Sequence, residues 1–393
     1  MLTVLKFGGS SLSTAEKIYN AARIAYEHKK QGKDVVMVVS AQGKSTDKLL
    51  MQASEIAESP DTRELDVLLS TGEQVSMSLV AMQLIAMGAP AVSLCGWQAG
   101  ILTEDKHNSS RIISIHTGRI KEELGRGKIV VVAGFQGVDS REDITTIGRG
   151  GSDTSAVALA AALGADECLI YTDVDGVYSA DPNIAEGALK HTALGYDQML
   201  EMASLGAGVL HNRSVELAKS KGVKLTVLSS TNSSGGTQIA PEPMEGSRVS
   251  GVICDKKTAL IEMFSNGIGE LPDILHLLAN SGIGADMIIS HGTRTGLTVP
   301  QERAKDALRL LLDHADTLKL SSVSADSNVA KLSVVGCGLC SDACVAPRML
   351  SVLKKQGIEV RSMVAAEIKI SVLIPRALAE DGVQAVHREF FCK

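Results

Sequence analysis

A lysine followed by a glycine-rich turn stands near the start of the chain, in the segment 6–11 (KFGGSS), between an apolar stretch and a predicted helix. The two glycines allow backbone N–H groups to turn toward an anion, the start of the helix adds a positive dipole end, and Lys6 adds a full charge. Such a segment is suited to bind a polyphosphate. Taken alone, it is also consistent with an ordinary turn beside a surface lysine. It is not a Walker A loop, because the patterns GxxxxGKS and GxxxxGKT are absent.

A second glycine-rich turn, the segment 145–154 (TTIGRGGSDT), leads directly into a predicted helix. Arg149 lies beside two glycines and is well placed to hold a carboxylate with two parallel hydrogen bonds. Ser152 or Asp153 lies near the N-cap of the helix. The alternative is that Asp153 only caps the helix and that Arg149 is a solvated charge, and for an isolated turn this plainer interpretation is favoured.

The third candidate is the segment 171–182 (YTDVDGVYSADP), which leaves the carboxyl end of an apolar strand-like stretch. Open α/β sheets bind ligands at this edge. The segment could hold a nucleotide base and ribose through tyrosine and backbone groups, and its acids could assist Mg²⁺. The alternative is that its Asp-Gly and Asp-Pro pairs simply form turns.

The elements that must position these residues alternate between strands and helices, which is typical of a largely parallel sheet covered by helices. The predicted strands are 2–7, 34–40, 91–94, 128–135, 167–173 and 224–230. The predicted helices are 14–30, 45–57, 63–86, 152–165 and about 208–221. The segment 231–247 has the Ser, Gly, Pro and Asn content of a linker.

The remaining part of the chain contains an internal repeat. A strand–helix–strand–strand–helix pattern begins at residue 258 and again near residue 329. A tandem pair of such units resembles ACT domains, which in many metabolic enzymes bind amino acids at their interfaces. We therefore expect three domains, with boundaries at 1–240, 241–325 and 326–393.

The order of the motifs is more informative than any one of them. KFGGSS, VSAQGKSTDKL (39–49), STGEQ (70–74), TTIGRGGSDTSAVALAAAL and YTDVDGVYSADP follow one another as in the amino-acid kinase family, and the chain resembles the aspartate kinases in particular. The resemblance covers nearly all of residues 1–240. It implies an α/β fold, an αβα sandwich of about eight strands followed by tandem ferredoxin-like (ACT) α+β units.

The resemblance also implies an activity: phosphoryl transfer from MgATP to the side-chain carboxylate of L-aspartate, giving 4-phospho-L-aspartate. This reaction is the first step toward lysine, threonine, methionine and diaminopimelate. It further implies site residues. The catalytic residues would be Lys6 and Asp153. Residues at the aspartate would be Ser40, Thr46, Glu73, Arg149, Gly150, Gly151 and Ser152. Residues at the ATP would be Lys6, Gly8, Gly9, Ser10, Tyr171, Thr172, Asp173, Val177, Tyr178, Ser179, Ala180, Asp181 and Pro182.

Composition excludes several other classes of protein. The 393 residues are 45% hydrophobic and carry a net charge of -6 without a Lys/Arg block, which argues against nucleic-acid binding. No apolar run approaches the ~20 residues that cross a bilayer, and the first residues lack the pattern of a secretory signal, so a cytosolic protein is expected. The seven cysteines are scattered, which favours thiols over a disulfide framework.

Cys337, Cys340 and Cys344 are the closest cysteines in sequence and could ligate Zn²⁺ with His276, His291 or His387. We interpret them instead as small residues in a loop that enters a helix, or as a redox-sensitive loop. No structural metal is therefore predicted.

The resemblance leaves partners and alternatives to be tested. ACT units commonly complete their sheets between chains, so a homodimer or a dimer of dimers is expected, with lysine or threonine as possible feedback effectors. One alternative is a kinase of the same fold for another carboxylate or phosphate. Another is a non-catalytic amino-acid and ATP sensor, against which the joint presence of Lys6, Arg149 and Asp153 argues.

Overall fold

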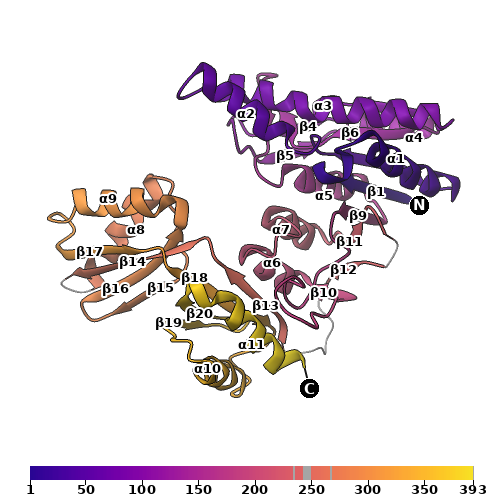
Figure 1. The fold of residues 1–393 in the computed structure, drawn as a ribbon. Coiled ribbons are helices and arrows are strands. Elements are labelled where there is room, and N and C mark those ends of the chain that lie inside the picture. The colour runs from indigo at the N-terminus through magenta and orange to yellow at the C-terminus, as the bar shows by residue number, and fades with distance from the viewer. Residues whose placement is uncertain (233–234, 242–248, 266–267, 393) are drawn as a thin grey trace. The chain divides into compact units, whose positions relative to one another are not determined.

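The computed structural model describes residues 1–232, 235–241, 249–265 and 268–392, which form two compact units (Figure 1). The first unit comprises Met1–Val177, Lys190–Ser204 and Gly208–Met244, and the second comprises Tyr178–Leu189, Leu205–Ala207 and Glu245–Lys393. Two short segments that interrupt the first unit in sequence therefore pack with the C-terminal part of the chain. Within the described residues, no helix is long and apolar enough to cross a membrane.

An eight-stranded sheet forms the centre of the first unit, in the order β10-β12-β11-β9-β1-β2-β6-β3. The strands from β11 to β3 are parallel, β12 is antiparallel to β11, and β10 is parallel to β12. Their bounds are β1 (Leu2–Phe7), β2 (Asp34–Val39), β3 (Ala91–Leu94), β6 (Ile129–Ala133), β9 (Glu167–Thr172), β10 (Ala193–Gly195), β11 (Leu225–Ser229) and β12 (Thr237–Ala240). The six predicted strands are confirmed to within one or two residues.

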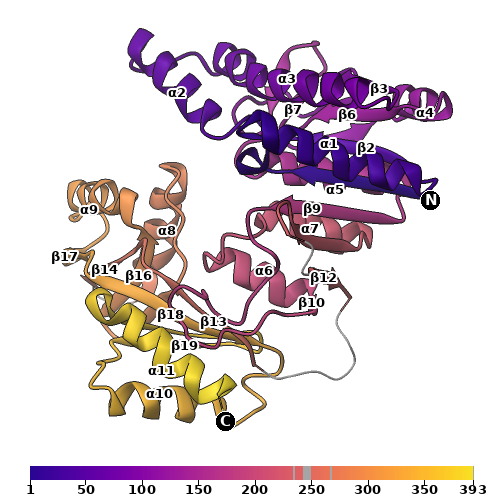
Figure 2. The same ribbon diagram turned by 45° about the vertical axis from the view of Figure 1, so that its right-hand side comes forward.

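Helices cover both faces of this sheet, as the predicted αβα sandwich requires. The helices of the first unit are α1 (Ala15–Lys30), α2 (Ser45–Ile56), α3 (Thr62–Ala86), α4 (Gly118–Gly125), α5 (Gly151–Leu163), α6 (Tyr196–Ser204) and α7 (Asn212–Lys221), with a short 3-10 helix η1 (Gly9–Leu12). Figure 2 shows α1 and α3 on one side of the strands and α5 with α7 on the other. The small buried residues of α5 allow it to lie close to β1, β2 and β9.

Two local predictions in this unit are wrong. The segment 231–247 is not only a linker, because β12 lies within it and extends the sheet, although residues 233–234 and 242–247 fall outside the described part. The helix predicted from about 208 begins at Asn212, after a turn in which Gly206 and Gly208 have positive φ angles. These glycines can adopt that backbone conformation, which stops the helix from extending toward α6.

A small four-stranded sheet, in the order β5-β4-β7-β8, was not predicted. Its strands lie between β3 and β9 along the chain. Its strands are β4 (Ile101–Thr103), β5 (Ile112–Ile115), β7 (Gln136–Val138) and β8 (Ile144–Thr146). Strands of three or four residues are too short to show an alternating pattern. This sheet positions the loops that end in residues 107–108 and 147–150.

The second unit contains two four-stranded sheets, which confirms the internal repeat. The first sheet has the order β15-β16-β14-β17 and the second β13-β18-β20-β19. The strands are β13 (Val249–Asp255), β14 (Thr258–Ser265), β15 (Ile288–His291), β16 (Arg294–Pro300), β17 (Leu320–Asp326), β18 (Val329–Gly336), β19 (Ser362–Ala365) and β20 (Lys369–Pro375). The helices are η2 (Ile268–Glu270), α8 (Leu271–Asn280), η3 (Gln301–Arg303), α9 (Ala304–Asp313), α10 (Val345–Lys355), η4 (Arg376–Leu378) and α11 (Ala379–Phe391).

The two repeats are not successive in space in the way the sequence suggested. β13 precedes the first repeat, yet it pairs with β18 of the second. β17, which follows the first repeat, pairs with β14. The second sheet therefore takes its fourth strand from residues that we expected to belong to the first ACT-like unit.

Candidate active site

A cavity of about 440 Å³ opens at the carboxyl end of β1 and β2 and is lined by all seven residues predicted at the aspartate. The predicted residues that line it are Lys6, Gly9, Ser40, Thr46, Glu73, Arg149, Gly150, Gly151, Ser152 and Asp153. They come from β1, the ends of β2 and β8, and the helices α2, α3 and α5. Because parallel strands end at the same edge of a sheet, motifs far apart in sequence meet here.

Lys6 and Asp153 form a buried ion pair, with 2.5 Å between Nζ and Oδ1. Their side chains are only 10% and 12% exposed. Asp153 lies in the first turn of α5 rather than at its N-cap, which is Gly150, so the interpretation of Asp153 as a plain cap is wrong. The pair holds the ammonium of Lys6 at the cavity wall.

Glu73 projects from α3 and is almost completely buried. Its Oε1 accepts a hydrogen bond of 2.9 Å from the backbone N–H of Ala41. Its Oε2 is buried and has no hydrogen-bond partner within the described residues. Burial raises the pKa of Glu73 to about 8, although the hydrogen bond from Ala41 opposes the shift. A buried carboxylate with an unused oxygen in a cavity is suited to receive a cation.

Two glycines are required by the shape of the cavity. A Cβ on Gly9 would lie 2.5 Å from the carbonyl oxygen of Ala41, so the turn after β1 can approach the turn after β2 only with glycine there. Gly150 has a φ of +67°, and a Cβ on it would lie 2.2 Å from Cγ of His211. Both contacts are far shorter than any side chain tolerates, and the left-handed backbone of Gly150 adds a further cost.

Arg149 lines the cavity and is exposed. Within the described residues, no hydrogen bond or ion pair holds its guanidinium. Its fork of donors is therefore available for an anion. Arg149 and Glu73 line the same cavity, which favours a ligand over the plainer interpretation of Arg149 as a solvated charge.

The loop that carries Arg149 is fixed by a residue that sequence reasoning missed. Asp66 on α3 is completely buried and accepts hydrogen bonds from the backbone N–H groups of Thr146, at 2.9 Å, and of Asn108, at 3.0 Å. It also accepts from the hydroxyl of Thr146, at 2.6 Å. On the other side, Arg213 donates to the carbonyl oxygens of Ile147 and Ser110.

Asp66 lies seven residues before Glu73, or about two helical turns, so both carboxylates lie on the same side of α3. This spacing is the signal in the sequence that could have singled out Asp66. Other lining residues that were missed are Ala41, Gly43, Asp47, Leu50, Leu69, Asn108, Phe135, Thr146 and Gly148.

The predicted ATP residues are only partly brought together. Gly8 and Ser10 lie in the turn after β1, but the N–H of Gly8 donates to the carbonyl of Tyr171 at 3.2 Å and is not directed to a ligand. Thr172 and Asp173 end β9 at the same sheet edge, where the Thr172 hydroxyl donates to Asp173. The ring of Tyr171 is buried and stacks on Phe7 with 4.7 Å between centroids, so it belongs to the core.

The segment from Val177 to Pro182 is shared between the two units, with Val177 in the first and the other residues in the second. Val177 is buried in the first unit, where its N–H donates to the hydroxyl of Thr237 at 2.8 Å. Tyr178, Ser179, Ala180, Asp181 and Pro182 belong to the second unit. Ser179 is completely buried there, its hydroxyl lies 2.8 Å from Nε2 of His387, and Ala180 joins the apolar core of the second sheet. The side chains of Ser179 and Ala180 therefore belong to the buried part of the second unit.

The described residues contain one group that could hold a metal ion, His107, Asp139 and Asp143, and it does not include Cys337, Cys340 or Cys344. Burial opposes the shift of Asp139, but its pKa is lowered by hydrogen bonds from the backbone N–H groups of Asp143 and Arg141 and from the Arg141 side chain. The side chain of Arg63 lowers the pKa of Asp143, which burial opposes. The group therefore consists of carboxylates that already have cationic partners.

An αβα sheet with a lysine and a glycine-rich turn at its carboxyl edge, followed by two ferredoxin-like sheets, defines the class of small-molecule kinases that carry ACT units. A model of the amino acid kinase family matches residues 1–229, and a model of the ACT domain matches residues 332–390. The aspartokinase of Bacillus sp. (strain MGA3) is 44% identical over 398 residues, which cover 99% of this chain and 97% of that protein.

Aspartokinase 2 of Bacillus subtilis (strain 168) is also 44% identical, over 397 residues and with the same coverage. The chain therefore belongs to the aspartokinases of the amino acid kinase family. The crystal structure of E. coli aspartokinase III in complex with aspartate and ADP aligns with a TM-score of 0.82 at 23% identity, covering 100% of both chains, and this likeness concerns the fold. The predicted family and fold class are confirmed.

Proposed function

We propose that this chain transfers the γ-phosphoryl group of MgATP to the side-chain carboxylate of L-aspartate, with the cavity at the edge of β1 and β2 as the active site. The observation that carries the proposal is the pairing, in one cavity, of the unused oxygen of buried Glu73 with the available guanidinium of Arg149. An amino acid presents an ammonium and a carboxylate, and these two residues complement both. E. coli aspartokinase III, a structural relative, was crystallised with aspartate and ADP.

The chemistry requires positioning more than proton transfer. The aspartate carboxylate is ionised at neutral pH, so no general base is needed. Its approach to the γ-phosphate brings two anions together. Lys6, held by Asp153 at the cavity wall, offsets this repulsion and stabilises the charge that develops on the transferred group. Ser40 and Thr46 line the same cavity and can donate to the bound aspartate.

We propose that the nucleotide binds at the carboxyl edge formed by β1 and β9, and the proposal is supported by the position of the turn from Gly8 to Ser10 beside Thr172 and Asp173. Mg²⁺ is usually held by phosphates, waters and one or two carboxylates, and Asp153 beside Lys6 fits that donor set. When bound, the metal neutralises charge on the phosphates. We retain Asp181 and Pro182, which are exposed, as candidate nucleotide contacts.

We further propose that residues 1–240 form the catalytic domain and that residues 241–325 and 326–393 form regulatory ACT-like units. E. coli aspartokinase III has also been crystallised with lysine and aspartate, so lysine is the first effector to test, with threonine second. We also propose a homodimer or a dimer of dimers and a cytosolic location, on the basis of the same family.

The direct test is acyl-phosphate formation, trapped with hydroxylamine as the hydroxamate, from L-aspartate, ATP and Mg²⁺. Turnover that is specific for aspartate among aspartate, glutamate and N-acetylglutamate supports the proposal. Turnover with another carboxylate alone would identify a different kinase of this fold. ATP binding by folded protein without turnover on any of them would support the sensor alternative.

A further inference from the structure

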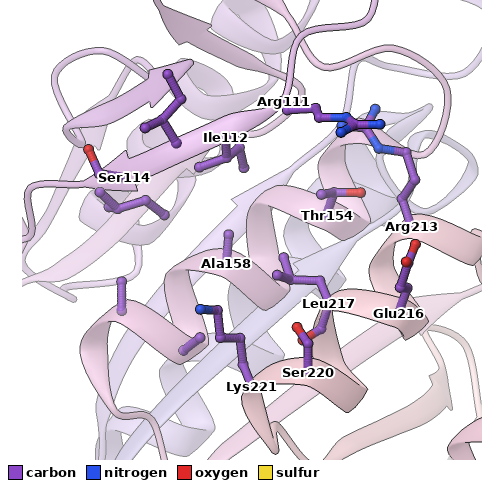
Figure 3. Close-up of a pocket in the computed structure, with 14 residues that line it drawn as sticks. Arg111, Ile112, Ser114, Thr154, Ala158, Arg213, Glu216, Leu217, Ser220 and Lys221 are labelled. Carbon is purple, nitrogen blue, oxygen red and sulfur yellow. The ribbon is translucent and has the colours of Figure 1, made fainter. Parts of the chain in front are cut away.

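A second cavity, of about 630 Å³, lies in the first unit and shares no residue with the active-site cavity. It is enclosed by α7, by one face of α5 and by β5, which is the edge strand of the small sheet (Figure 3). Its volume is within the range of roughly 300–1,000 Å³ that small-molecule sites occupy. The proposed reaction does not use it.

The wall formed by α7 has a cationic residue at each end, with Glu216, Leu217 and Ser220 between them. Arg213, Leu217 and Lys221 all line the cavity. They are spaced by four residues, so they lie along one face of the helix. The two charged residues are eight residues apart, which corresponds to about 12 Å along the helix axis.

Arg111, at the start of β5, doubles the positive charge at one end. Figure 3 shows the guanidinium groups of Arg111 and Arg213 next to each other. Burial lowers the pKa of Arg213, and the nearby charge of Arg111 lowers it further. Within the described residues, no ion pair or hydrogen bond holds the guanidinium of Arg111, and the carboxylate of Glu216 at the cavity rim pairs with neither arginine. The nearby charges of Glu104 and Glu216 raise the pKa of Arg213, but within the described residues neither acid forms an ion pair with Arg111 or Arg213. Two adjacent guanidinium groups without a paired acid favour a bound anion.

The space between the cationic ends has an apolar side formed by Ala158 and Ala161 of α5, Leu217 of α7 and Ile112 of β5. Its polar lining residues are Ser114, Thr154, Glu216 and Ser220. A ligand must therefore present an anion to Arg111 and Arg213, an apolar middle to the alanines, and a second anion to Lys221. We propose that this cavity is a binding site for a small linear dianion with an apolar middle, of the chemical class of the dicarboxylates.

The site is also connected to the active site through Arg213. One end of its guanidinium faces the cavity, and its other N–H groups donate to the carbonyl oxygens of Ile147 and Ser110. Ile147 lies two residues before Arg149. A dianion that binds Arg213 therefore alters the hydrogen bonds that hold the loop carrying Arg149, and with them the affinity for aspartate. By linkage, bound aspartate alters the affinity for the dianion. This connection rests on the proposed function, whereas the binding site does not.

The experiment is isothermal titration calorimetry of the full chain with adipate, which has a carboxylate at each end of four methylene groups. Hexanoate, with one carboxylate, and 1,6-hexanediol, with none, are the matched probes. We expect saturable adipate binding at millimolar concentration or below, and affinity about tenfold weaker for hexanoate, since one charge-assisted contact is lost.

Four variants localise the binding. Arg111→Ala and Lys221→Ala should each weaken adipate binding about tenfold. Lys224→Ala removes an exposed charge three residues beyond Lys221 and outside the cavity, and it should bind as the wild type does. Arg149→Ala should also bind adipate as the wild type does. This variant is the control for the aspartate site, because adipate bound there would be lost with Arg149.

The proposal is overturned if adipate shows no saturable heat, if Arg111→Ala and Lys221→Ala bind like the wild type, or if only Arg149→Ala loses binding. A change of oligomeric state in Arg111→Ala without adipate binding would make the cavity an interface between chains instead. The connection to the active site is tested separately: adipate should alter the KM for aspartate in the wild type but not in Arg111→Ala. Loss of kinase activity altogether leaves the calorimetric result intact.

Discussion

The protonation of Glu73 predicts how aspartate affinity depends on pH. Its pKa of about 8 means that, at pH 7, roughly ten molecules of free enzyme carry a neutral Glu73 for each that carries a carboxylate. In the proposed binding mode, the ammonium of aspartate pairs with the ionised form of Glu73. Aspartate binding must therefore release a proton from Glu73 at any pH below about 8.

The magnitude follows from the same value. Below pH 8, removing the proton costs about 1.4 kcal/mol for each pH unit, so aspartate affinity should rise about tenfold per unit from pH 6 to pH 8 and then level off. The substrate carboxylates are fully ionised over this range and contribute no slope. Calorimetry at pH 7 in two buffers of different ionisation enthalpy should count about 0.9 proton released per aspartate bound.

The control is Glu73→Gln, which keeps the hydrogen bond from Ala41 and removes the titration. It should bind aspartate with no proton release and no slope. The same variant tests stability. The folded pKa is above the unfolded value, so the wild type loses stability as pH rises between about 4.5 and 8, by roughly 1.4 kcal/mol per unit, and Glu73→Gln should lack that decline. Proton release that persists in Glu73→Gln, or wild-type binding without any release, would refute the assignment.

The remaining predictions concern the other residues of the cavity. Lys6→Ala should lower kcat by about 10²–10³-fold and should also destabilise the fold, because it leaves the buried carboxylate of Asp153 without its partner. Adding Asp153→Asn should restore the stability, since the unpaired charge is removed, while kcat stays low. Steady-state kinetics measure the first effect and thermal unfolding the second. Arg149→Ala should raise the KM for aspartate by about 10–100-fold with an unchanged melting temperature, since it removes an exposed side chain; an unchanged KM would exclude Arg149 from binding. Asp66→Asn should lower the free energy of unfolding in urea by about 3 kcal/mol, because an amide nitrogen cannot accept a hydrogen bond from Thr146. It should raise the KM for aspartate more than it lowers kcat. Equal effects on KM and kcat would mean a purely structural role.

The sequence predicted those features that long, regular patterns encode. The buried strands of the main sheet are continuous apolar runs such as 34–39, and α1 begins directly after Thr14, whose side chain accepts from the N–H of Lys17. The order of the motifs, in which the chain resembles the aspartate kinases, was enough to group the substrate residues. The strand pattern alone accounts only for the turns after β1 and β2, because Arg149 follows β8 of the small sheet and Glu73 lies within α3.

Features that depend on distant pairs were not accessible in this way. Asp66 contacts Thr146 across 80 positions, and no local pattern marks that contact. β13 pairs with β18 rather than with the strands that follow it, because the choice of partner is made by packing in three dimensions. The raised pKa of Glu73 likewise depends on burial by other segments.

The segment 178–189 also limits how modular this protein can be. The chain leaves the first unit after Val177, adds Ala180 and Ala185 to the core of the second sheet of the second unit, and returns at Lys190. Ser179 lies inside that core, where its carbonyl accepts from Val252 at 2.7 Å and its hydroxyl lies against His387. A chain that ended near residue 240 would expose two apolar residues and remove the contacts of Ser179 with Val252 and His387, although its hydrogen bonds with Leu189 would remain. The catalytic and regulatory parts are therefore separable in sequence only at the expense of this shared segment, and any change in the packing of the second sheet acts on residues that are covalently joined to the loop after β9.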